Sequence, residues 1–393
     1  TFSYTPTSTG APLFPNVPPA ASLTSPTPPT PASIFYFAKN FQNPYAQQYN
    51  LTLQQDLGKQ NVLSVTYMGA GGRELPNFLN LNYDPAATYT QNYRVTPDNT
   101  GNCGPLACGS VIQSKVYSAR KVNANGSGTS VNTLNPGFNA VTGIYSNINS
   151  QYDAVTADIT NRAFRWATFD VNYTYAHALD YNQNETSSTT TNNWYDPYAN
   201  ALNNYGNSSL NVRHRVVGWA ILQMPGVKQG NALSYLVNGW SLKPLIQAQS
   251  GLPYSIVASG NAANQCNGAN CLNAGSSGLA GTGVTYIPQL GRNTFMYPRT
   301  ILMDLRAQKD INFNALDHNV SLQFIGEAFN LANHRNVTGL NTTGYSIAST
   351  QGATPAATAA TIQYQTSFGS VTSANSNYAY GPRNIQLAIR LLF

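Results

Sequence analysis

Stretches in which apolar and polar residues alternate recur along the chain, separated by polar segments of very different length. The last stretch, residues 383–393, is the clearest, because every second residue from Ile385 to Phe393 is apolar while the residues between them are mainly polar. A β-strand turns successive side chains to opposite faces, so this pattern predicts a strand with one apolar and one polar face. Its length suits a tilted membrane-crossing strand of roughly nine to eleven residues. A soluble β-sandwich could end on a similar strand, so this segment alone leaves both architectures open.

Eight further stretches show the same alternation and are predicted to be strands. They cover residues 47–57, 61–68, 151–162, 166–177, 211–223, 239–250, 300–311 and 319–330. Long and short connections follow one another between these strands. Outer-membrane barrels have long extracellular loops and short periplasmic turns, whereas soluble sandwiches use mostly short loops. The alternation therefore favours an all-β, antiparallel transmembrane β-barrel and predicts that residues 383–393 pair with residues 319–330.

The strand count predicts how much of a barrel the chain contains. The alternating stretches give nine strands. With Phe393 at the periplasmic side, counting back from the last strand makes the first strand run inward. Single-chain bacterial barrels have even strand counts. We therefore expect residues 47–393 to be the C-terminal part of a longer barrel, with no plug in this sequence. Residues 1–46 are rich in Pro, Ser and Thr. They are predicted to form an extended extracellular loop, because Pro lacks the donor that a strand ladder needs.

The composition supports a membrane barrel. Only 9% of the 393 residues are charged, whereas a typical soluble domain has roughly 25%. The chain contains 25 Tyr and 31 Gly, and its net charge is +6. The basic residues are scattered, so no nucleic-acid partner is expected. We instead expect contact with outer-membrane lipid and lipopolysaccharide, and localisation in the bacterial outer membrane.

Six segments resemble the TonB-dependent receptor-like proteins of acidobacterial type, the Oar-like group. These segments are residues 40–76, 152–180, 211–226, 238–256, 322–337 and 381–393. The resemblance implies a barrel of roughly 22 strands preceded by a plug that contacts the TonB system. It further implies a receptor that imports or exports a substrate. A structural or adhesive surface barrel without energised transport remains the alternative. The strand that contains Ile385, Leu387, Ile389, Leu391 and Phe393 is expected to be a signal for the barrel-assembly machinery.

Charged residues at predicted lumenal positions are candidates for contact with a plug or a substrate. The alternative is a wet inner wall with paired charges, and we favour that alternative because the lumen of such barrels is polar. The positions are Asp158, Asp170, Lys243, Asp304, Arg306, Glu327 and Arg390.

Four cysteines lie in predicted extracellular loops with C-x4-C spacing. Because oxidation persists outside the cell, two local disulfides are expected, Cys103–Cys108 and Cys266–Cys271. A site with four thiolate ligands for a metal is the alternative, although this spacing is at the edge of the usual range.

Other loop residues suggest binding rather than catalysis. Trp194, Tyr195, Tyr198 and Tyr205 could stack on sugars or peptides, or could form a packed loop core. Asp180, Asn182 and Asn184 match the start of a calcium loop, but Glu185 stands where that loop requires Gly. The four histidines, at positions 177, 214, 318 and 334, fit no catalytic motif. No enzymatic activity, cofactor or metal is therefore expected.

Overall fold

The computed structural model describes most of the chain beyond residue 31. The described residues are 32–86, 88–117, 120–122, 128–129, 133–135, 137–181, 194, 196–227, 232–262, 271–273, 277–315, 318–350, 359–376 and 381–393. Most of the Pro-rich segment, Tyr195, Cys266, Asn182 and Asn184 lie outside them.

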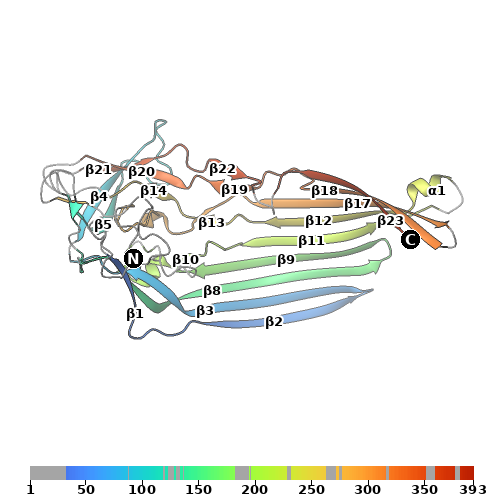
Figure 1. The fold of residues 1–393 in the computed structure, drawn as a ribbon, viewed down its shortest axis with the longest axis horizontal. Coiled ribbons are helices and arrows are strands. Elements are labelled where there is room, and N and C mark those ends of the chain that lie inside the picture. The colour runs from blue at the N-terminus through green and yellow to red at the C-terminus, as the bar shows by residue number, and fades with distance from the viewer. Residues whose placement is uncertain are drawn as a thin grey trace, which may run out of the picture.

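Nine antiparallel strands form the main path of an 11-stranded open sheet, called here the wall (Figure 1). Its order follows the chain: β2 (Tyr45–Gly58), β3 (Asn61–Asn80), β8 (Phe138–Phe164), β9 (Ala167–Asp180), β11 (His214–Gln223), β12 (Trp240–Gln249), β17 (Thr300–Ala315), β18 (His318–Phe329) and β23 (Asn384–Leu392). All nine predicted strands are present. The predicted pairing of the last strand with its predecessor is confirmed, since Phe324 lies opposite Ile389 and Ala328 opposite Ile385.

Short and long connections lie at opposite ends of the wall. The hairpins β2–β3, β8–β9 and β17–β18, together with the C-terminus, occupy one end, called here the turn end (Figure 1). The β11–β12 connection, which contains the short helix α1 (Ala232–Val237), lies there too. The long connections gather at the other end, called here the loop end (Figure 1). The predicted alternation of long and short connections is therefore confirmed, since each kind gathers at its own end of the wall.

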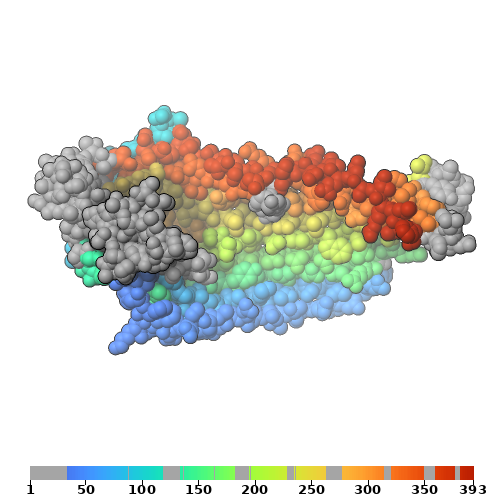
Figure 2. Space-filling model, in the orientation of Figure 1, coloured from blue at the N-terminus to red at the C-terminus, as the bar shows by residue number. Residues whose placement is uncertain are grey.

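Each face of the wall has its own chemistry because the register keeps like positions side by side. One row of facing residues is apolar from strand to strand: Leu53, Val65, Ala157, Tyr173, Val216, Ala248 and Ile301. The adjacent row on the opposite face begins with Thr52, Thr66, Thr156 and Thr174. The apolar face is widely exposed, with Leu387 85% and Ile389 70% accessible. Figure 2 shows the strands following one another across the molecule from blue to red.

Aromatic side chains mark both ends of the apolar face. Near the loop end, the hydroxyl of Tyr67 donates to Asp153 at 2.8 Å, and Tyr173 and Tyr175 pack against His214. At the turn end, the indole N–H of Trp240 donates to the carbonyl of Leu236 at 2.8 Å. Trp166 stacks on Phe164 there, and Phe393 is 96% exposed. An amphipathic ring with a polar partner suits a membrane–water interface.

Two wall strands continue far beyond the length that a membrane crossing needs. β3 has 20 residues and β8 has 27, against roughly nine to eleven for one crossing. The predicted strands 61–68 and 151–162 cover only the part of β3 and β8 next to the turn end. A further strand was also not predicted: β1 (Ala32–Phe37), within the segment predicted as loop, pairs in parallel with β8.

The long connections fold into a second body, called here the outer cap. Its largest sheet has the order β14 (Val257–Ser259), β20 (Thr343–Thr350), β21 (Ala359–Tyr364), β4 (Thr88–Thr96) and β5 (Val111–Tyr117). Smaller strands complete it: β6 (Arg120–Val122), β7 (Gly128–Thr129), β13 (Pro253–Tyr254), β15 (Cys271–Asn273), β16 (Phe295–Met296), β19 (Val337–Leu340) and β22 (Val371–Ala374). The short strand β10 (Gly206–Asn207) instead pairs with the end of β9 in the wall. Two 3₁₀ turns, Ala201–Asn204 and Pro288–Leu290, lie in the same connections. The outer cap has a buried core that includes Tyr93, Ile256, Tyr345 and Ile362, each 0% exposed.

No helix among the described residues is long and apolar enough to cross a membrane.

Candidate functional site

All seven predicted lumenal charges lie on the polar face of the wall. The register places Asp158 opposite Asn172, Asp170 opposite Trp219, Lys243 opposite Arg306, Arg306 opposite Glu327 and Arg390 opposite Gln323. Asp304 lies opposite Leu245 in the same set of positions. Period-two alternation was sufficient to find this face, because a one-residue error in register would have moved every charge to the lipid side.

Most of these charges are engaged by neighbours within the wall. Arg306 and Glu327 form an ion pair at 3.5 Å, with side chains 36% and 31% exposed. Lys243 Nζ donates to Gln308 Oε1 at 2.8 Å, and Gln308 Nε2 donates to Asp310 Oδ1 at 2.8 Å. Among the seven charges, the described contacts are one ion pair, Arg306–Glu327, and hydrogen bonds such as Lys243–Gln308. They leave the polar face strongly hydrophilic without a concentrated charge of one sign.

Two aspartates also serve as acceptors for nearby groups. Asp170 accepts from the hydroxyl of Thr160 at 2.8 Å, and Asp304 accepts from the backbone N–H of Asn330 at 2.8 Å. Asp304 therefore helps to hold the turn that follows β18. It also lines a cavity of about 690 Å³ between that turn and Arg383.

The strand β11 carries apolar side chains on both faces. One alternating set of β11 contains the apolar residues Val217, Trp219 and Ile221. The register places these three on the polar face, because Val217 pairs with Asn172 and Trp219 with Asp170. The lipid face of β11 carries Val216 and Leu222 with smaller residues between them. Alternation alone does not show which face of β11 contacts lipid, since both alternating sets are apolar.

The aromatic loop residues proposed as a binding site are mainly structural. Trp194 is 3% exposed, packs with Leu79 and Ile148, and donates from its indole to the carbonyl of Tyr181 at 2.9 Å. The hydroxyl of Tyr198 lies 2.8 Å from the carbonyl oxygen of Leu81. The packed-core alternative therefore describes Trp194, whereas Tyr198 is 36% exposed.

Tyr205 is the most exposed of the three described residues of this group. It is 41% exposed, and its ring centroid lies 4.9 Å from that of Tyr181. Partial burial raises its pKa above the ordinary value for tyrosine, so the hydroxyl stays neutral at physiological pH.

Asp180, the first residue of the calcium-like pattern, is bound by an arginine. Arg292 forms an ion pair with Asp180 at 2.6 Å, and the two side chains are only 6% and 15% exposed. Arg292 also donates to the carbonyls of Asn204 at 3.0 Å and Gly206 at 3.2 Å. This contact fastens the outer cap to the end of β9. The described residues contain no cluster of three or more His, Cys, Asp or Glu side chains that could hold a metal ion.

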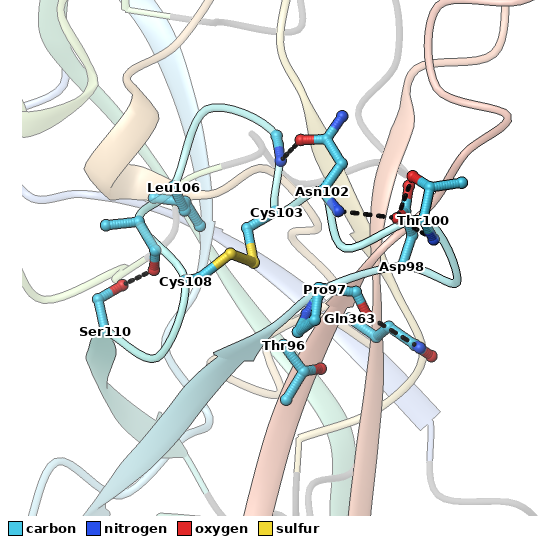
Figure 3. The surroundings of a disulfide bond; sticks show 12 residues. Thr96, Pro97, Asp98, Thr100, Asn102, Cys103, Leu106, Cys108, Ser110 and Gln363 are labelled. Carbon is cyan, nitrogen blue, oxygen red and sulfur yellow. Dashed lines mark hydrogen bonds between the residues drawn. A yellow bond between two sulfur atoms is a disulfide. The ribbon is translucent and has the colours of Figure 1, made fainter.

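The Cys103–Cys108 disulfide is present in the outer cap, with the two Cα atoms 5.4 Å apart (Figure 3). Next to it, Asp98 accepts hydrogen bonds from Thr100 and from the backbone N–H of Asn102 at 3.0 Å (Figure 3). The hydroxyl of Tyr345 donates to the carbonyl of Cys103 at 2.6 Å. Burial raises the pKa of Tyr345 to about 12. The disulfide loop is thus tied to the core strand β20.

A cavity of about 530 Å³ lies where the wall meets the outer cap. Gln249 and Thr300, a facing pair at the outer ends of β12 and β17, lie at its wall side. Tyr254 and Tyr297 come from the connection between these strands, and Thr338 comes from the last long connection. No sequence motif marks this site, because its lining residues come from separate segments between Ser209 and Thr342.

The sequence matches the family described as outer membrane beta barrel domain over residues 1–386. The chain belongs to this family. Its wall is accordingly the antiparallel β-sheet of an outer-membrane barrel, and its location is the bacterial outer membrane. The loop end with the outer cap then faces outward and the turn end faces the periplasm.

Among solved structures, the chain is similar to the outer membrane transporter YddB from Escherichia coli. The TM-score is 0.39 and the identity 10%, over 85% of this chain and 34% of that chain. The chain thus spans about a third of the length of that transporter. No curated protein matches the sequence.

Proposed function

We propose that this chain is the barrel part of a TonB-dependent, Oar-like receptor that moves a substrate across the outer membrane. The observation that carries the proposal is the hydrophilic face that extends over the wall opposite the lipid face. Several of its charges are engaged within the wall, as in the Arg306–Glu327 ion pair and the Lys243–Gln308 hydrogen bond. Such a surface suits a lumen that a substrate or a plug must pass without being trapped.

The edges of the wall support a barrel larger than these nine strands. β2 and β23 each pair with one neighbour among the described strands. All residues of β2 and β23 are exposed. A long unpaired edge is unfavourable in lipid, because its backbone N–H and C=O groups lack partners. Closure by further strands would satisfy both edges.

The proposed partners follow from this arrangement. The barrel-assembly machinery would recognise β23, whose Leu387 and Phe393 are 85% and 96% exposed. Lipid and lipopolysaccharide would contact the apolar face. The TonB system would act through a plug encoded with the barrel. We propose no catalytic activity for the chain.

A structural or adhesive surface protein is the second candidate function. The outer cap favours it, because a body with a buried core of its own could bind a neighbouring surface without any transport.

Purification of the complete gene product from outer membranes separates the two. The receptor should retain purified TonB C-terminal domain, and removal of the region that encodes the plug should abolish retention. If the complete product neither encodes a plug nor retains TonB, the transport proposal fails and the adhesive function stands.

A further inference from the structure

The cavity at the junction of wall and outer cap has the composition of a ligand site. Its volume of about 530 Å³ falls within the roughly 300–1,000 Å³ of small-molecule sites. Residues from three separate parts of the chain meet there: Gln249 with Thr300 from the wall, Tyr254 with Tyr297, and Thr338 from β19. All of them are described residues. The site lies at the outer end of the polar face, where a substrate from outside would first meet the wall.

The lining of the cavity is uncharged. It consists of hydroxyl, amide, aromatic and aliphatic groups, and contains no Asp, Glu, Lys, Arg or His. Arg215, which faces Gln249 on β11, is not a lining residue. A strongly anionic ligand would require Arg or Lys partners, and a cationic one would require carboxylates. Both classes are disfavoured, because desolvation of their charge would have no compensation here.

Two tyrosines provide an aromatic platform. The rings of Tyr254 and Tyr297 lie edge to face with centroids 5.1 Å apart. Phe295 and Phe368 support Tyr254 at 5.8 Å and 6.3 Å. At Gly251, an added Cβ would lie 1.8 Å from the carbonyl oxygen of Tyr297, so only glycine allows this close approach.

Both tyrosine hydroxyls have unused hydrogen-bonding capacity within the described part of the chain. No described residue donates to or accepts from the hydroxyl of Tyr254 or Tyr297. Burial raises the pKa of Tyr254, so its hydroxyl remains a neutral donor and acceptor. A purely apolar ligand would leave these groups unpaired, which is unfavourable.

We propose that this cavity binds a neutral, hydroxyl-rich ligand, an uncharged oligosaccharide. Sugar rings present C–H faces that pack on aromatic rings, and hydroxyls that both donate and accept. Tyr254 and Tyr297 contact the sugar faces, while their hydroxyls and that of Thr300 bond to the hydroxyls of the sugar. The inference rests on the proposed transport function for its physiological meaning, because it identifies the substrate class of that receptor.

Calorimetric titration of the protein purified in detergent from outer membranes tests the proposal. The probes are maltohexaose, cellohexaose and N-acetylchitohexaose, with hexagalacturonate as the acidic counterpart. At least one neutral hexasaccharide should bind, and at least tenfold more tightly than hexagalacturonate. The Tyr254→Ala variant should weaken that binding at least tenfold, because a central aromatic contact is lost. The matched control Tyr36→Ala, which removes an exposed tyrosine of β1 outside the cavity lining, should change it less than twofold.

Each contrary result overturns the proposal. It fails if no neutral hexasaccharide binds, if hexagalacturonate binds as tightly, or if Tyr254→Ala and Tyr36→Ala have equal effects. Should Tyr254→Ala alter hydrogen exchange in the outer cap, Tyr254→Phe and Thr300→Val replace it. Each should weaken binding severalfold, and unchanged binding by both is again contrary.

The binding assay requires neither TonB nor energy, so it separates this inference from the transport function. Binding with the expected variant effects but without TonB retention overturns only the transport function. TonB retention without neutral-glycan binding overturns only the substrate class.

Discussion

The wall and the outer cap bury apolar residues in opposite ways. In the outer cap, Ile256 and Ile362 are 0% exposed because strands from distant connections pack around them. In the wall, Leu387 and Ile389 are 85% and 70% exposed, although they belong to the most regular strand. Only a surrounding lipid phase removes those side chains from water. Apolar strand residues are therefore removed from water by protein packing in the outer cap and by lipid on the wall.

The largest loss of stability is expected when the Asp180–Arg292 contact, which joins the wall and the outer cap, is removed. Arg292→Ala leaves Asp180 buried without its partner, so we expect a loss of about 3–5 kcal/mol of outer-cap stability. Hydrogen exchange should show faster exchange in β4, β20 and β21 with unchanged protection of the wall. Arg299→Ala, an exposed arginine of the same connection, is the control. Equal effects of both variants would contradict the role of the ion pair.

Truncation within the outer-cap core should also be costly. Ile362→Ala removes a fully buried side chain, so we expect a loss of about 2–5 kcal/mol through lost burial and a cavity. Thr361→Ala, on the opposite face of β21, should cost less than about 1 kcal/mol. Denaturant unfolding followed by hydrogen exchange provides the measurement. If Ile362→Ala is tolerated as well as Thr361→Ala, the outer cap has no cooperative core.

An arginine introduced on each face of β23 in turn should show which face contacts lipid and which faces the lumen. Leu387→Arg puts a guanidinium into lipid and should cost about 2–4 kcal/mol near the membrane midplane. Gln386→Arg, one residue earlier on the polar face, should cost less than about 1 kcal/mol. Folding efficiency into lipid vesicles, read from the heat-modifiable gel shift of the barrel, measures both. The opposite ranking would mean that the faces are assigned wrongly.

The disulfide should contribute locally. Changing Cys103 and Cys108 together to Ser releases a short loop, for which chain entropy suggests about 2 kcal/mol. Faster exchange should appear in residues 97–110 while the wall remains unchanged. Faster exchange in the wall strands would show that the two regions are coupled more strongly than the structure indicates.

Alkaline pH should loosen the same loop by a smaller amount. Tyr345 is held neutral in the folded state by burial, which raises its pKa to about 12 from the ordinary 10. Its stabilisation is therefore complete below pH 10 and is lost as pH rises from about 10 to 12. Exchange of residues 97–110, measured at several pH values and corrected for intrinsic rates, should show this window. Tyr345→Phe should remove it.

Period-two alternation was enough to find the wall. It located all nine strands, the pairing of the last two and the face of all seven lumenal charges, because lipid and lumen impose opposite polarity on alternate residues. It failed where that contrast is weak. On β11 both sets are apolar, and Val217, Trp219 and Ile221 lie on the polar face. The predicted strands 61–68 and 151–162 stop short of the outer parts of β3 and β8, because beyond the membrane no lipid enforces the alternation.

The sequence by itself determined the wall, the two ends and the Cys103–Cys108 pair, since these depend on local periodicity and spacing. Only the tertiary structure decided the outer cap, the Asp180–Arg292 contact and the cavity between Tyr254, Tyr297 and Thr300. The physical reason is that these features join segments far apart in the chain. Their irregular packing follows from three-dimensional complementarity, for which a single sequence carries no repeating signal.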